Sequence, residues 1–114
     1  MSDCRVPMPT YQRRPVMYII GPVSGIEQDN RPAFEQMRKE LVSKNPQREV
    51  LIPHDFIPAG TDWNTAMRKS VRQLMTADCV FALDGWRRST GARIEADLCA
   101  ALGIPLYQKK EAVL

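Results

Sequence analysis

One acidic side chain falls on a helix face that should be buried. In a helix expected over residues 90–102, the apolar stripe consists of Ile94, Leu98, Cys99, Ala101 and Leu102. Glu95 projects between Leu102 and Cys99 within this stripe. Removing a lone carboxylate from water costs several kcal/mol, so a buried glutamate needs a partner or a ligand. Gly91, one turn earlier, leaves space beside it for a ligand. Two interpretations stay open: a functional carboxylate in a pocket, or an edge glutamate that reaches solvent or pairs with an arginine.

The start of the same predicted helix has the features of a phosphate site. Ser89 and Thr90 offer hydroxyls and free backbone N–H groups where the helix dipole is positive, and Arg87, Arg88 and Arg93 are nearby in sequence. An ordinary helix cap among solvated arginines explains the same residues.

Loops that follow predicted strands hold further candidates. The loop Gly21-Pro22-Val23-Ser24-Gly25 could surround a sugar or phosphate through Gly21, Pro22, Ser24 and Gly25, or form a plain tight turn. It lacks the G-K-[ST] and G-x-G-x-x-G patterns of common nucleotide loops. Asp84 could accept a hydrogen bond from a sugar hydroxyl and Trp86 could stack on a base, although a simple turn explains both.

Two other groups could take part in proton transfer. His54 and Asp55 follow a predicted strand and could act as a proton-transfer pair. Tyr18, inside another strand, is either a core residue or a phenol that lines a pocket.

Alternating elements must position these residues. Strands are expected at 16–20, 49–52, 79–83 and 104–107. Helices are expected from Pro32 to the Asn45-Pro46 breaker, from a cap at Thr61 or Asp62 to Met75, and from Ser89 to Leu102. Such alternation predicts right-handed crossovers and a parallel sheet between helices. We expect a three-layer, doubly wound α/β fold, flavodoxin- or Rossmann-like, with strand order 2-1-3-4. Ligands of such sheets bind beyond the carboxyl ends of the strands.

Composition limits the class of protein. The chain has 114 residues, of which 44% are hydrophobic and 25% charged, as expected for one globular domain. We expect a flexible basic arm over residues 1–14 and a single α/β domain over 15–114. The net charge of +3 includes +2 in the arm, from Arg5, Arg13 and Arg14 against Asp3. The folded part is therefore not expected to carry a stripe of basic residues that would bind nucleic acid.

Location and metal content are also constrained. The longest apolar stretch, 16–23, is far short of the roughly 20 residues that span a bilayer. Without a signal peptide the protein is expected in the cytoplasm. Three scattered cysteines and a single histidine predict reduced thiols and no metal site.

Three motifs together resemble the nucleoside 2-deoxyribosyltransferase-like family, most closely its short, phage-associated, uncharacterised branch. They are Tyr18-Ile19-Ile20-Gly21-Pro22-Val23-Ser24-Gly25, Ala77-Asp78 before an apolar strand, and Gly85-Trp86 with Ser89-x-Gly91-x-x-x-Glu95. The branch usually carries L-P-G-W-x-x-S-x-G-A-x-x-E, which is matched here by L-D-G-W-R-R-S-T-G-A-R-I-E. The resemblance covers about residues 16–107.

The resemblance implies an enzyme that cleaves the N-glycosidic bond of a deoxynucleoside or deoxynucleotide, with neither metal nor organic cofactor. Glu95 falls on the family's nucleophile, which attacks the anomeric carbon, and Tyr18 on a tyrosine near it. The loop 21–25 falls on the segment around sugar and phosphate. Ser89, six residues before the glutamate, matches the phosphate-binding serine of members that act on monophosphates. Family members usually complete the site across a homodimer, so a dimer or larger even assembly is expected.

Two departures from the family bear on the reaction. Ser70 stands where the family has an aspartate on the preceding helix, which leaves protonation of the leaving base to another group such as Asp84 or His54. Ser24 stands where some monophosphate hydrolases have an arginine, so phosphate affinity would rest on Arg87 or Arg88. The leading hypothesis is a nucleotide N-glycosidase or deoxyribosyltransferase-like enzyme. The alternative is a module that binds or senses a nucleotide without turnover.

Overall fold

The computed structural model describes residues 14–109 and contains a four-stranded parallel sheet. The strands lie in the order β2-β1-β3-β4, which confirms the predicted fold class and topology. Their bounds are β1 Val16–Ile20, β2 Glu49–Leu51, β3 Cys79–Ala82 and β4 Leu106–Gln108. The helices are α1 Arg31–Lys44, α2 Trp63–Leu74 and α3 Thr90–Leu102. Short 3₁₀ turns that the sequence did not predict are η2 Glu27–Asn30, η3 Pro53–Asp55 and η4 Trp86–Arg88.

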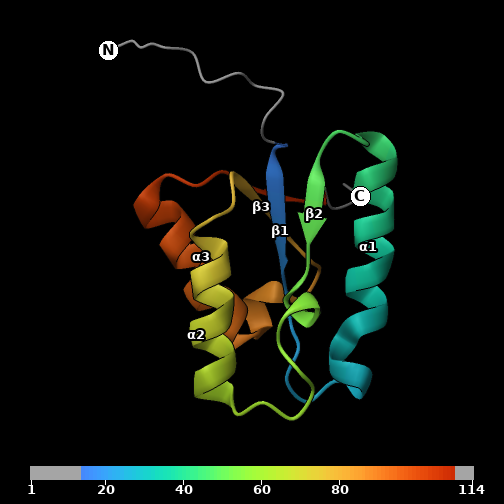
Figure 1. The fold of residues 1–114 in the computed structure, drawn as a ribbon. Helices are drawn as coiled ribbons and strands as arrows, with labels where there is room; N and C mark the ends of the chain where they lie inside the picture. The colour runs from blue at the N-terminus through green and yellow to red at the C-terminus, as the bar shows by residue number, and fades with distance from the viewer. Residues whose placement is uncertain (1–13, 110–114) are drawn as a thin grey trace, which may run out of the picture.

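The helices cover both faces of the sheet. Figure 1 shows α1 on one face and α2 with α3 on the other, with the strands pointing toward the loops that precede α2 and α3. Alternating residues of β1 divide between two cores, because neighbouring side chains of a strand point to opposite faces. Ile19 packs with Phe34 and Leu41 of α1. Tyr18 packs on the other side with Leu74 of α2 and Cys99 of α3.

The buried face of α3 differs from the predicted one. Small residues and Glu95 face the sheet, and the buried set is Gly91, Ala92, Glu95, Ala96 and Cys99. Ile94 and Leu102, which were expected in the core, are 39% and 56% exposed. Small side chains allow the helix to lie close to the sheet, so the larger apolar residues turn outward. The prediction that Glu95 lies on the buried face is nevertheless confirmed.

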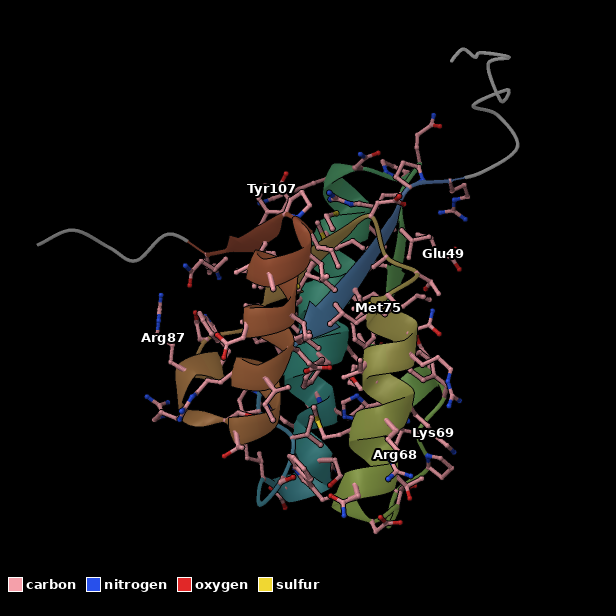
Figure 2. All side chains as sticks on the ribbon, turned by 90° about the vertical axis from the view of Figure 1, so that its left-hand side faces the viewer. Glu49, Arg68, Lys69, Met75, Arg87 and Tyr107 are labelled. Atoms are coloured by element: carbon pink, nitrogen blue, oxygen red, sulfur yellow. The ribbon has the colours of Figure 1, made fainter. Side chains whose placement is uncertain are left out.

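The apolar stripe predicted for α2 is likewise only partly buried. Leu74 and Ser70 face the core, whereas Trp63 and Met75 at the two ends of the stripe are each 44% exposed. Figure 2 looks onto α2 and α3 side by side, with Met75 near the end of α2. The two helices therefore expose large apolar side chains beside the charged Arg68 and Lys69 of α2.

Most of the predicted basic arm, residues 1–13, lies outside the described residues. Arg14, the last residue of that segment, donates hydrogen bonds to the carbonyls of Pro46, Gln47 and Arg48 at 3.0–3.3 Å. None of the described helices is both long and apolar enough to cross a membrane. Within the same residues, no cluster of three or more His, Cys, Asp or Glu side chains could hold a metal ion.

Candidate functional site

A pocket of about 190 Å³ opens at the carboxyl edge of the sheet. It lies between the loops that follow β1 and β2 and the first turns of α2 and α3, where the topology predicts a ligand. Its polar lining residues are Ser24, Asp29, His54, Thr61, Ser70, Ser89 and Glu95. The rest of the wall is mostly apolar and includes Ile57, Pro58, Trp63 and Met67. Within residues 14–109, no lysine or arginine lines this pocket.

A chain of buried hydrogen bonds ends on Glu95. The Ser70 hydroxyl donates to Glu95 Oε2. The Tyr18 hydroxyl lies 2.7 Å from Ser70 Oγ. Because Ser70 has one proton and gives it to the carboxylate, Tyr18 must be the donor in the second bond. Three elements thus hold one carboxylate in a fixed orientation: Tyr18 from β1, Ser70 from α2 and Glu95 from α3.

Burial shifts the ionisation of this group. Glu95 is only 5% exposed, and loss of water raises the pKa of its carboxyl to about 7, against an opposing effect of the Ser70 hydrogen bond. Burial and the neighbouring Glu95 charge raise the pKa of the Tyr18 phenol, which therefore stays protonated. Burial, and then the Glu95 charge, raise the pKa of the Cys99 thiol to about 11. The carboxylate is thus poised between its charged and neutral forms near neutral pH.

The two helices meet where Gly91 faces Met67. A Cβ atom built on Gly91 would lie 2.9 Å from the Met67 sulfur, closer than real side chains allow. The space predicted for a ligand beside Gly91 is therefore partly filled by Met67. Gly91 still lines the pocket, because its missing side chain leaves the backbone open next to Glu95.

A second pocket, of about 370 Å³, adjoins the first at the start of α3. Ser24, Trp63, Ser89 and Gly91 line both pockets, and Arg88 and Thr90 line only the second. The Ser89 hydroxyl accepts a hydrogen bond from the Ala92 amide at 3.2 Å and so caps α3. A positive helix terminus and a guanidinium therefore face one cavity, which suits an anionic group.

Several predicted site residues come together around these pockets. Gly21, Ser24, Ser89, Gly91 and Glu95 line the first pocket. Pro22 lines the second. Tyr18 reaches the site through Ser70.

Three other predicted residues, Gly25, Asp84 and Trp86, line neither pocket. Asp84 is exposed at the end of β3. The Trp86 indole donates to Gln108 Oε1 at 3.1 Å and carries the Arg87 guanidinium 4.7 Å from its ring centre. Figure 2 shows Arg87 projecting outward from this turn. Trp86 is therefore engaged with the β4 side of the molecule.

His54 lines the pocket but does not pair with its neighbour in sequence. Asp55 instead accepts from Arg38 at 2.7 Å and from the Ile52 amide at 3.0 Å. The His54 Nε2 atom lies 2.7 Å from the Asp29 carbonyl, to which it must donate. Its Nδ1 atom is enclosed and has no partner within residues 14–109. The proposed proton-transfer pair is therefore not formed.

The His54 contact supports an unusual turn beside the pocket. Gln28, Asp29 and Asn30 all have left-handed backbone angles, with φ of 56°, 53° and 59°. Such angles are costly for residues other than glycine and persist only where neighbours hold them. His54 binds the Asp29 carbonyl, and the Asn30 amide donates to the Pro22 carbonyl at 2.8 Å. The turn thus joins the loops after β1 and β2.

Trp63, Met67 and Ile57 also line the pocket, although no pattern in the sequence predicts this role for them. All three come from the loop after β2 or the helix that it leads into, which the carboxyl-edge rule already implicated. Ser70 was noticed only as a departure from a family pattern, because no spacing rule places a serine opposite a glutamate on another helix.

Residues 15–108 match the family described as "Domain of unknown function (DUF4406)". Among solved structures, the fold is similar to that of a 2-desoxiribosyltransferase from Leishmania mexicana, with a TM-score of 0.63 and 21% sequence identity. The match covers 82% of this chain and 63% of that chain, so this chain spans less than two thirds of that protein. No curated protein sequence matches. At this identity the likeness establishes a shared fold.

Proposed function

The chain belongs to the DUF4406 family, and we propose from the geometry of its pocket that it cleaves the N-glycosidic bond of a nucleoside monophosphate with Glu95 as nucleophile. The observation that carries this proposal is the buried carboxylate itself. Glu95 stands in a pocket wall, held by Ser70 and Tyr18 and shielded from water. A structural role alone gives no reason to keep a desolvated carboxylate in a wall.

The carboxylate suits both stages of glycoside cleavage. One Glu95 oxygen attacks the anomeric carbon, the bond from this carbon to the base nitrogen breaks, and the base departs. The negative charge also stabilises the positive, oxocarbenium-like transition state. Water then displaces the carboxylate for hydrolysis, or a second base does so for transfer. Ser70 and Tyr18 act as positioning residues, because their hydrogen bonds fix the Glu95 side chain.

The second pocket suits the 5′-phosphate of the same nucleotide. Ser89 and the first amides of α3 face it, together with Arg88, and it adjoins the first pocket through four shared residues. A sugar beside Glu95 would direct its phosphate toward the helix terminus. The similarity in fold to a 2-desoxiribosyltransferase supports a nucleoside-type ligand.

One observation favours a second candidate function. Ser70 replaces the aspartate expected by family resemblance and donates its proton to Glu95, so the site has no second carboxyl on α2. A module that binds a nucleotide without turnover would place the same Glu95 oxygens against the sugar hydroxyls.

A panel of nucleoside and deoxynucleoside monophosphates separates the two functions. Each is incubated with the full-length protein, free base is quantified by chromatography, and binding is measured by calorimetry. The enzyme proposal predicts release of base from at least one monophosphate. Tight binding with no base released from any compound would support the binding module and contradict the enzyme.

A further inference from the structure

The pocket contains a nucleophile, but few of the described residues that line it could protonate a departing base. Neutral bases usually require protonation as the glycosidic bond breaks, and a general acid contributes about 10²–10⁴-fold to such reactions. The Ser70 proton is donated to Glu95, and serine is not among the side chains that commonly serve as acids. The Tyr18 hydroxyl is fully buried behind Ser70, and burial raises its pKa.

Neither nitrogen of His54 is available to protonate a base. Nε2 gives its hydrogen to the Asp29 carbonyl, and Nδ1 is enclosed away from solvent. Asp84, the other acid that the sequence offered, is exposed and lies outside both pocket linings. Asp29 is the only other acidic residue, apart from Glu95, in the lining formed by residues 14–109.

The charges around the two pockets are also segregated. The first pocket is lined by the acidic residues Asp29 and Glu95, and no lysine or arginine of the described chain lines it. Trp63 lines both this pocket and the adjoining one. The adjoining pocket contains Arg88 and the positive end of α3. Carboxylates and an indole face attract a cation. The arrangement therefore complements a ligand with a cationic base at one end and a phosphate at the other.

We propose that the substrate is a nucleotide whose base carries a permanent positive charge, either a pyridinium or an N7-alkylated purine. This inference rests on the proposed function of Glu95 as nucleophile. A cationic base departs without a proton donor, so its release would depend neither on Asp29 nor on any other acid of the pocket.

The reaction balances without an acid. A Glu95 oxygen forms a bond to the anomeric carbon as the bond from that carbon to the ring nitrogen breaks. The bonding electron pair moves to the nitrogen, cancels the positive charge, and releases a neutral base. Water then attacks the anomeric carbon and displaces Glu95. The products are the free base, the sugar phosphate and one proton released to solvent.

Matched pairs of compounds that differ in charge test the proposal. Nicotinamide mononucleotide is compared with its reduced form, whose dihydropyridine base is uncharged, and N7-methylguanosine monophosphate is compared with guanosine monophosphate. We expect the full-length protein to release the cationic base at least about 10²-fold faster within each pair, corrected for spontaneous hydrolysis. Glu95→Gln should abolish the faster release of the cationic base. Asp97→Asn, which changes an exposed carboxylate on the same helix, should retain that faster release.

The pH profile gives a second readout. The groups that interact with Glu95 are Ser70, Tyr18 and Cys99, and the other titratable residues that line the pocket are Asp29 and His54. With the pKa of Glu95 raised to about 7, release of nicotinamide from nicotinamide mononucleotide, whose pyridinium ring has no ionisable ring proton, should increase with pH through that region and then level off. A fall on the alkaline side would reveal an essential acid and contradict the proposal.

Failure of this inference differs from failure of the proposed function. Release of neutral bases at rates equal to or above those of their cationic partners would overturn the inference but retain Glu95 as nucleophile. Loss of neutral-base release in Asp29→Asn would identify Asp29 as the acid and also overturn it. Absence of release from every compound would contradict both.

Discussion

The buried charge of Glu95 should destabilise the folded protein, and this effect should appear as a pH dependence of stability. Its carboxyl has a pKa of about 7 in the folded protein against 4.5 ordinarily. Between these values the folded state binds more protons than the unfolded state, so the free energy of unfolding falls as pH rises. The loss should approach about 3 kcal/mol above pH 7. Glu95→Gln should lack this loss and be the more stable protein at pH 8.

Urea unfolding of both proteins from pH 4 to 8 checks this expectation. Asp97→Asn is the control, because Asp97 is exposed on the same helix and its loss leaves Glu95 buried. Parallel stability curves for wild type and Glu95→Gln would mean that the carboxylate is not desolvated.

Phosphate recognition by Ser89 can be separated from its capping role. Ser89→Ala removes one charge-assisted hydrogen bond to phosphate, worth about 1.5–3 kcal/mol, but also the cap on Ala92. Ser89→Asp preserves the cap and places a negative charge at the phosphate position. Both variants should weaken binding of nucleoside monophosphates far more than that of nucleosides. Equal losses for both ligand types by calorimetry would refute the phosphate site.

Two neighbouring arginines provide a matched comparison. Arg88 lines the second pocket, whereas Arg87 lies over the ring of Trp86. Arg88→Gln should therefore weaken monophosphate binding by about tenfold, and Arg87→Gln should leave it near the wild-type value. The reverse order would place the phosphate elsewhere.

Individual residues show where prediction from sequence ends. Glu95 could be placed on the buried face of its helix because helical periodicity is a local property. Ser89 could be placed at the start of the helix because capping is local as well. The position of the Trp86 side chain could not be predicted, because its contact with Gln108 depends on how the loop after β3 meets β4. The contact between Ser70 and Glu95 joins two helices, and no local pattern in the chain encodes it.

At the scale of elements, the contact between α2 and α3 controls the pocket. Gly91→Ala would place a methyl group 2.9 Å from the Met67 sulfur, and the flexible Met67 side chain would have to move within the pocket wall. We expect a loss of about 1–2 kcal/mol in stability and weaker ligand binding. Adding Met67→Ala should recover much of the binding. If Gly91→Ala changed neither stability nor ligand binding, that result would contradict a close contact between these helices.

Element positions were predictable because chain breakers mark them. Pro32, Asn45-Pro46 and Gly103 lie at or beside observed helix ends, and the Asp62 cap accepts a hydrogen bond from the Thr65 amide. The face that each helix buries was less predictable. In α3 the small residues face the sheet and Ile94 faces solvent, since packing distance, and not hydrophobicity alone, decides which side can approach.

At the scale of the whole molecule, we predict that the chain forms a dimer through the outer face of α2 and α3. An open groove there of about 790 Å³ is lined by Trp63, Met67, Val71 and Ile94, with Arg68 and Arg72 at its side. Trp63 lines both this groove and the pockets, which would bring the second copy close to the site.

Val71→Lys should therefore convert a dimer into a monomer in sedimentation experiments at micromolar concentration. Val42→Lys on α1, which changes an exposed valine on the opposite face of the sheet, should leave the dimer intact. A wild-type monomer that still binds nucleotide would contradict a site shared between copies.

The central claim is that Glu95 is the nucleophile, and base release by Glu95→Gln tests it most directly. The amide retains the shape of the side chain but cannot attack the anomeric carbon, so the variant should bind nucleotide and lose at least about 10³-fold in base release. Asp97→Asn should release base at the wild-type rate. Release by Glu95→Gln at the wild-type rate, under the conditions in which wild type is active, would contradict the account.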